Sequence, residues 1–274
     1  MENFNSFGLD KNILENLSKL RLIKPTPIQI QAIKPALEGK DILGSANTGT
    51  GKTAAFGIPL IQKLNQNSNI SGLILTPTRE LAIQVSKHLT DLMGKNIKIK
   101  STVIIGGDSI RKQLKELKQS PRLFIGTPGR INDHLSRGSL KLNTTELIVL
   151  DETDRMLDMG FSIQIEKIIK YLPKKRQTLL FSATLPKNIK KISEKYLYKP
   201  IRISVDQNKE ILSSIKHQIF NLSHSEKYTK LLEQLDKRDG SIIIFMKTKH
   251  SSKRMALKLQ KQNQRRLSQY ENHL

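Results

Sequence analysis

The sequence predicts an α/β fold in which a parallel sheet is covered by helices on both faces. Short apolar runs recur along the chain without alternating with polar residues, as expected of strands that are buried on both faces. These runs are residues 41–43, 73–75, 103–105, 123–125, 147–150 and 179–181. Helix-like stretches separate them, at 51–66, 78–93, 109–119 and 162–171. Strands that alternate with helices are typical of a parallel sheet.

Composition excludes several classes of protein. The 274 residues are 37% hydrophobic, which is enough for one or two packed cores. The absence of cysteine excludes disulfide scaffolds, zinc ribbons and thiol catalysis. No apolar run approaches the roughly 18 residues of a membrane span, and the first residues lack a signal-peptide pattern, so we expect a cytoplasmic protein without membrane association.

The net charge indicates a polyanionic partner. Lysine and arginine total 47 against 24 acidic residues, a formal net charge of +23. Such an excess favours nucleic acid, although lysines that merely solvate the surface are the alternative.

The pattern changes near residue 206, which predicts two units of unequal size. We expect a first domain over 1–205, a linker over 206–213 and a partial second domain over 214–274. The second domain is predicted to hold a helix at 225–236, a buried strand at 241–245, a helix at 250–262 and a disordered tail from about 262. One strand and its helix cannot cover their own sheet, so this unit looks incomplete.

Polar clusters follow each predicted strand of the first domain. They read GSANTGTGKT, TPTRE, GGD, GTPGR, DETD and SAT in chain order. Because ligands bind at the carboxyl ends of the strands in open α/β sheets, the clusters predict a binding edge.

The first cluster fits a phosphate-binding loop. It contains Ala46-Asn47-Thr48-Gly49-Thr50-Gly51-Lys52-Thr53, with Ala46 where such loops usually begin with glycine. Gly49 and Gly51 allow a tight turn whose N–H groups converge on phosphate oxygens, and the following helix adds its positive end. Lys52 is then predicted to reach the β- and γ-phosphates, and Thr53 to bind Mg²⁺.

Two carboxylates complete this prediction. Asp151 and Glu152 follow a buried strand of the same sheet. Asp151 is assigned to Mg²⁺, directly or through water, and Glu152 to the attacking water as orienting group or base. Binding and hydrolysis of ATP or GTP follow.

The ordered set of motifs resembles the DEAD-box RNA helicases of helicase superfamily 2, from Phe4 to about Leu259. The resemblance implies a RecA-like first domain, an incomplete second RecA-like lobe, and ATP-dependent unwinding of short RNA duplexes. Residues 2–30 resemble the Q motif of this family, in which Gln29 would bind adenine and select ATP. Phe4 matches the upstream aromatic of the motif, whereas Leu22 replaces the usual aromatic against the base.

The resemblance also implies a site for the RNA backbone. The matching segments are motif Ia, the GG doublet and motif Ib, represented by Pro77, Thr78, Arg79, Gly106, Gly107, Thr127, Gly129 and Arg130. Hydroxyls, glycine N–H groups and arginine can bind phosphates but do not distinguish one base from another. RNA binding should therefore be insensitive to base sequence and sensitive to salt concentration.

Asp151-Glu152-Thr153-Asp154 stands at the DEAD position, with Thr153 in place of alanine. A tightly packed site would make this extra bulk cost about 1–3 kcal/mol. Asp154 is expected to link the nucleotide site to Ser182-Ala183-Thr184, in which Ser182 and Thr184 couple hydrolysis to strand separation.

The family's later motifs, with two arginines that stabilise the γ-phosphate in the transition state, have no counterpart in the sequence after Leu259. We therefore expect a truncated helicase that retains ATP binding, with weak RNA binding and feeble or absent unwinding. The alternatives are a non-catalytic ATP- and RNA-binding remnant, and another phosphate-loop class such as a nucleotide kinase or DNA helicase.

Overall fold

The structure, a computed structural model, describes residues 3–47, 49–205 and 216–271, without the side chains of Asn188 and of residues 263–271. The chain divides into two compact units, residues 1–214 and 215–274. The linker expected at 206–213 lies outside the described residues.

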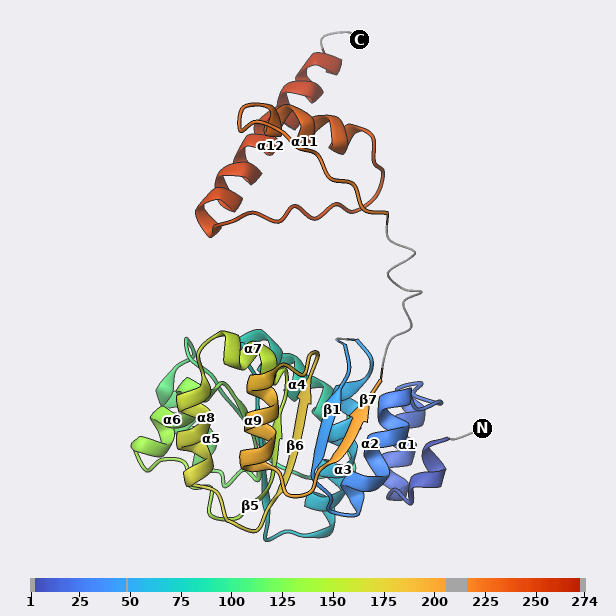
Figure 1. Cartoon of the computed structure of the whole chain (residues 1–274), viewed down its shortest axis with the longest axis vertical. Helices are drawn as coiled ribbons and strands as arrows, with labels where there is room; N and C mark the ends of the chain where they lie inside the picture. The colour runs from blue at the N-terminus through green and yellow to red at the C-terminus, as the bar shows by residue number, and fades with distance from the viewer. Residues whose placement is uncertain (1–2, 48, 206–215, 272–274) are drawn as a thin grey trace. The chain divides into compact units, whose positions relative to one another are not determined.

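A seven-stranded parallel sheet forms the centre of the first unit (Figure 1). Its strands lie in the order β3-β4-β2-β5-β6-β1-β7. They are β1 (Ile42–Ser45), β2 (Ser71–Leu75), β3 (Ser101–Ile104), β4 (Leu123–Gly126), β5 (Thr145–Leu150), β6 (Gln177–Ser182) and β7 (Ile201–Ser204). The first six correspond to the six apolar runs, so the predicted parallel α/β sheet is confirmed.

Helices cover both faces of this sheet. The helices of one core are α1 (Lys11–Lys19), α2 (Pro27–Leu37), α3 (Lys52–Gln66) and α4 (Arg79–Met93). Those of the other core are α6 (Pro128–Ser136), α7 (Thr153–Asp158), α8 (Ser162–Lys170) and α9 (Lys187–Tyr196), with α5 (Ile110–Leu117) contributing Leu117. A short 3₁₀ helix, η1 (Phe4–Phe7), precedes α1.

Successive residues of a central strand enter opposite cores, which explains the unbroken apolar runs. In β5, Leu147 and Val149 belong to the core of α1–α4, whereas Ile148 and Leu150 belong to the core of α6–α9. The edge strand β3 instead alternates between buried and half-buried residues, because only one of its faces is fully covered.

The described part of the second unit contains α11 (Glu226–Asp236) and α12 (Lys249–Glu271). The prediction of a buried strand at 241–245 is wrong: these residues form no strand, and Ile243 and Phe245 are 78% and 90% exposed. A strand needs a paired neighbour, and the two helices of the unit supply none. Helix α12 continues beyond residue 262, where the tail is expected to begin.

Among the residues that the structure describes, no helix combines the length and the apolar character that crossing a membrane requires.

Candidate functional site

A cleft of about 630 Å³ lies where residues that follow β1, β2 and β5 meet. Because all strands are parallel, their carboxyl ends share this edge of the sheet. The cleft brings together predicted residues from four distant segments: Gln29, Gly49, Gly51, Lys52, Thr53, Thr78, Asp151 and Glu152.

The predicted phosphate loop connects β1 to the first residue of α3. Gly49 and Gly51 have φ angles of 87° and 91°, in the left-handed region that glycine adopts without strain. The Lys52 side chain is buried, and its Nζ donates a hydrogen bond to the Ala46 carbonyl at 3.0 Å. The Thr50 hydroxyl closes the turn by donating to the Asn47 carbonyl at 2.8 Å. Thr48 lies outside the described residues.

Gln29 joins α2 to this loop. Its Oε1 accepts a hydrogen bond from the Thr26 backbone N–H at 2.9 Å, and its Nε2 donates to the Gly51 carbonyl at 3.1 Å. A side chain at position 51 would overlap the Gln29 amide, so glycine is required there for packing as well as for backbone geometry. Gln29 thus sits at the base of the cleft; its contact with adenine stays a prediction.

The structure separates Phe4 from the cleft. Phe4 is 4% exposed, packs edge-on against Phe7 at 6.1 Å between ring centroids, and belongs to the core of α1–α4. Leu22 lies on the cleft lining and also borders the small hollow next to Phe4. Phe4 therefore lies behind the cleft wall, and the half-buried Leu22 lines the cleft.

Asp151 and Glu152 lie at the end of β5. Burial raises the pKa of Asp151 to about 6, opposed by the positive charge of Lys52 and reinforced by the negative charge of Glu152. The Asp151 Oδ1 accepts a hydrogen bond from the Glu152 backbone N–H at 3.0 Å. A divalent cation beside Asp151 would favour its charged form.

The donor set fits Mg²⁺ better than a metal held by protein alone. The described residues contain no group of three or more histidine, cysteine or carboxylate side chains that could hold a metal. Mg²⁺ typically binds one or two protein ligands together with phosphate oxygens and water. The buried Asp151 carboxylate and Thr53, both on the cleft lining, suit that arrangement.

Glu152 is held in an unusual backbone conformation. Its φ angle is 48°, in the left-handed region, and its Oε2 accepts from Arg155 Nη1 at 2.7 Å. Arg155, which in the sequence is only a flank of the acidic motif, therefore lines the cleft beside the predicted base. This contact directs the Glu152 carboxylate along the first turn of α7.

Thr153 fits its position in the fold. Its side chain is fully buried, and its hydroxyl donates toward the carbonyls of Leu150 at 3.1 Å and Phe181 at 3.2 Å. The hydroxyl thus gains hydrogen-bond partners at the ends of two neighbouring strands.

Asp154 connects the acidic motif that follows β5 to the segment after β6. Its Oδ2 accepts three hydrogen bonds, from Ala183 N at 3.1 Å, Thr184 N at 3.0 Å and Thr184 Oγ1 at 3.0 Å. On the opposite side, Ala46 N donates to the Ser182 carbonyl at 3.1 Å. Residues 182–184 therefore contact both the phosphate loop and the acidic motif.

The segments predicted to bind RNA lie at the carboxyl ends of β2, β3 and β4, of which β2 is the neighbour of β5 and β3 the edge strand. Thr78 begins α4 and accepts from Leu81 N at 3.2 Å, and Thr127 precedes Pro128 at the start of α6. The Arg79 guanidinium packs against the Gly106-Gly107 backbone so closely that a side chain at Gly107 would overlap it. Apart from Phe4 and the undescribed Thr48, the predicted nucleotide and RNA residues thus lie along the same edge of the sheet.

Sequence reasoning did not assign the polar residues of α4 to the cleft; it placed Glu80 in the RNA-binding motif Ia and gave Gln84 and His88 no role. Glu80, Gln84 and His88 on α4 line the cleft, and their spacing of four places them on one helix face. Burial lowers the pKa of His88, opposed by Asp91. The periodicity is visible in the sequence, but only the fold shows that this face of α4 borders the phosphate loop.

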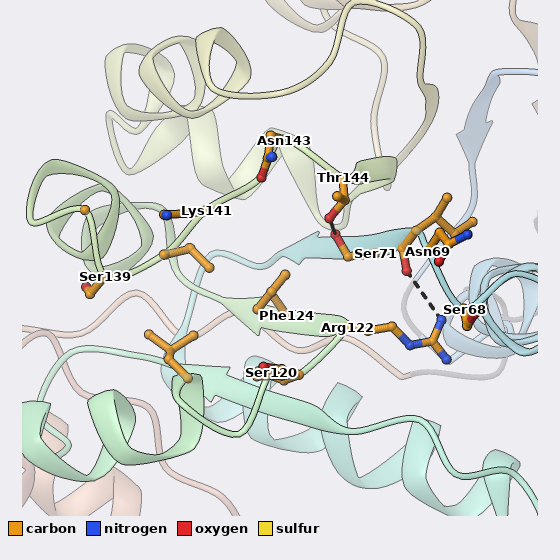
Figure 2. Close-up of a pocket in the computed structure, with 15 residues that line it drawn as sticks. Ser68, Asn69, Ser71, Ser120, Arg122, Phe124, Ser139, Lys141, Asn143 and Thr144 are labelled. Atoms are coloured by element: carbon orange, nitrogen blue, oxygen red, sulfur yellow. Dashed lines mark hydrogen bonds between the residues drawn. The ribbon is translucent and has the colours of Figure 1, made fainter.

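A second hollow, of about 430 Å³, lies at the opposite edge, before the starts of β2, β4 and β5 (Figure 2). It contains none of the predicted site residues. Arg122 lines this hollow, but its guanidinium already has partners within the fold. Its Nη1 donates hydrogen bonds to the carbonyls of Leu64 and Asn67, both at 2.8 Å. This hollow is therefore a weaker candidate site than the cleft.

Comparison with known proteins points to the helicase family that the sequence motifs resemble. The DEAD/DEAH box helicase family profile matches residues 26–192. The ATP-dependent RNA helicase CshA of Listeria monocytogenes is 45% identical over 253 residues, which are 91% of this chain and 48% of that protein. The DEAD-box ATP-dependent RNA helicase CshA of Bacillus subtilis is 41% identical over 248 residues, covering 90% of this chain and 50% of that protein.

A solved structure of a DEAD box protein from the hyperthermophile Methanococcus jannaschii matches with a TM-score of 0.72 and 39% identity, over 94% of this chain and 70% of that one. The chain spans about half the length of the curated relatives it matches. The family profile covers more than half of the chain, and its range contains the phosphate loop, the acidic motif and residues 182–184. The chain therefore belongs to the DEAD/DEAH box helicase family.

Proposed function

We propose that this chain binds ATP with Mg²⁺ in the cleft and the RNA backbone along the same sheet edge, and that it is an RNA-stimulated ATPase that separates short duplexes. The proposal rests on the three hydrogen bonds that the Asp154 carboxylate accepts from residues 183 and 184. Because these bonds join the acidic motif that follows β5 to the segment after β6, a change in shape at one of them can be transmitted to the other.

Each cleft residue has a distinct task in the proposal. The N–H groups of residues 49–52 and the Lys52 ammonium bind the triphosphate, and Gln29 recognises adenine. Asp151 and Thr53 hold Mg²⁺, which supplies charge neutralisation on the phosphates when bound. Glu152 orients the attacking water and accepts its proton, after its carboxylate exchanges the Arg155 contact for the water.

RNA is the proposed polyanion because the edge offers main-chain donors, hydroxyls and Arg79 rather than a groove-reading helix. Such contacts address phosphate and sugar and give binding that is independent of base sequence. The net charge of +23 adds long-range attraction. The relatives that are named RNA helicases support RNA as the partner. With RNA as its partner, the protein is expected in the cytoplasm.

The decisive experiment is ATP hydrolysis by the purified chain with and without single-stranded RNA. We expect RNA to raise the rate, and Lys52→Ala to abolish nucleotide binding and hydrolysis. The exposed Lys19 provides the matched control, since Lys19→Ala removes the same charge away from the cleft. Unchanged nucleotide affinity in Lys52→Ala would refute the assignment of the cleft.

A non-catalytic binder of ATP and RNA is the second candidate. It is favoured by the second unit, in which residues 241–245 form no strand and leave apolar side chains exposed. We propose residues 1–205 as the nucleotide-binding helicase domain and 214–274 as a partial second lobe. RNA that binds without accelerating hydrolysis would favour this candidate over the enzyme.

A further inference from the structure

A buried polar network links the helices that follow β3 and β4. Gln113 on α5 and His134 on α6 are both fully buried. The His134 Nε2 lies 3.0 Å from Gln113 Oε1, and its Nδ1 lies 2.8 Å from the Ser139 hydroxyl. The Gln113 Nε2 donates to the Ile105 carbonyl at 2.8 Å.

The hydrogen-bond directions in this network follow from chemistry. Only the amide NH₂ of Gln113 can donate to the Ile105 carbonyl, so its Oε1 faces His134 as an acceptor. His134 Nε2 must therefore carry a hydrogen. Burial lowers the pKa of His134, and the positive charge of Arg130 lowers it further, so the ring is neutral near pH 7. Its unprotonated Nδ1 lies 2.8 Å from the Ser139 Oγ, whose one hydrogen is shared between Nδ1 and the His134 carbonyl oxygen at 3.1 Å.

The network ends at two of the proposed RNA-binding segments. Ile105 directly precedes the Gly106-Gly107 turn, so the Gln113 amide holds the backbone that enters this turn. His134 lies on α6, whose amino terminus carries Gly129 and Arg130. One backbone bond, from Thr127 N to the Ile104 carbonyl at 3.2 Å, joins the same two segments.

We propose that Gln113 and His134 are positioning residues for RNA, which hold the Gly106-Gly107 turn and the amino terminus of α6 at a fixed separation. Neither residue touches RNA, because both are buried. Successive phosphates of one strand can meet two sets of donors only if the donors keep the spacing of the backbone. The inference rests on the proposed RNA-binding function and specifies what makes that surface rigid.

The substitutions His134→Gln and His134→Asn test the proposal as a matched pair. The glutamine amide nitrogen occupies the position of Nε2 and preserves the donor to Gln113, whereas the asparagine amide nitrogen occupies that of Nδ1 and does not. Gln113→Leu removes the amide altogether. Gln119, exposed and a few residues away, supplies the control Gln119→Leu.

The measurements are the affinity for fluorescent polyuridylate at several salt concentrations, the affinity for a fluorescent ATP analogue, and the melting temperature. We expect His134→Asn and Gln113→Leu to weaken RNA binding on the order of tenfold. Their plots of log affinity against log salt should become shallower by about 0.7 for each phosphate that the variant no longer neutralises. His134→Gln and Gln119→Leu should retain the wild-type RNA affinity and slope, and all four variants the wild-type ATP affinity.

A merely structural role predicts another pattern. If His134→Asn and Gln113→Leu lower the melting temperature but keep the wild-type salt slope at temperatures where they are folded, the inference is wrong. The same holds if His134→Gln loses as much RNA affinity as His134→Asn. Failure of the wild-type chain to bind polyuridylate would instead overturn the proposed function itself, before any variant is compared.

Discussion

Replacement of Asp151 by asparagine should stabilise the ligand-free protein, and the gain should depend on pH. Asp151 lies buried at the end of β5, where burial raises its pKa to about 6. The unfolded chain ionises this group near its ordinary pKa of 3.8. Between these two values the folded protein binds the extra proton, so this carboxylate lowers the free energy of unfolding as the pH rises.

The size of the effect follows from the two pKa values. Because the pKa of Asp151 is raised on folding, its ionisation does not affect the free energy of unfolding below pH 3.8. Above pH 6 it lowers that free energy by the full amount. The full contribution is about 3 kcal/mol, of which about 1.4 kcal/mol develops between pH 5 and pH 7.5. Asparagine cannot ionise and retains an oxygen that can accept the Glu152 backbone N–H.

Urea unfolding of wild type and Asp151→Asn at several pH values from 5 to 7.5 measures this quantity. The difference in the free energy of unfolding should grow in favour of the variant as the pH rises. Comparing this change, rather than the absolute difference, cancels the packing effects of asparagine. The control is Asp158→Asn, at an exposed residue of the following helix, which measures how loss of a surface carboxylate changes the free energy of unfolding. A constant difference between wild type and Asp151→Asn would refute the argument from burial.

Three further outcomes are expected. The affinity for Mg²⁺ and ATP, followed by fluorescence, should fall about tenfold from pH 7 to pH 5, because the ionised fraction of Asp151 falls with its pKa of about 6; a flat profile contradicts its role as a Mg²⁺ ligand. Asp154→Ala removes three hydrogen bonds to residues 183–184 and should abolish RNA stimulation of ATPase without changing ATP affinity; retained stimulation would place the coupling elsewhere. Thr153→Ala should cost about 1 kcal/mol in urea unfolding, and an unchanged or raised stability would mean that its hydroxyl bonds contribute nothing.

Local pattern was sufficient for most of the first unit. The runs at 147–150 in β5 and 179–181 in β6 were recognisable because the parts of a strand that are buried on both faces are unbroken apolar runs. The geometry of the predicted phosphate loop was recognisable because glycines with positive φ, a lysine and a helix start must be contiguous in the chain to form such a loop. Both are properties of short segments, which one sequence displays completely.

Long-range relations were less accessible. Phe4, predicted at the nucleotide, is a core residue behind Leu22, and the apolar segment 241–245 pairs with no strand among the residues that the structure describes. The bond between Arg155 and Glu152 and the cleft-facing side of α4 carry no motif that distinguishes them from an ordinary helix surface. Whether an apolar segment becomes a strand, or an aromatic residue a ligand contact, depends on what the rest of the chain packs against it.

The amino-acid order alone was enough to predict a parallel sheet, a glycine-rich loop after its first strand, a paired acidic motif and a strongly basic composition. Tertiary structure decided how these parts act on one another: the burial of Asp151, the three bonds of Asp154 and the Gln113–His134 network. The reason is physical, because chain connectivity sets the local motifs, whereas electrostatic environment and hydrogen-bond partners arise only when distant segments are brought into contact.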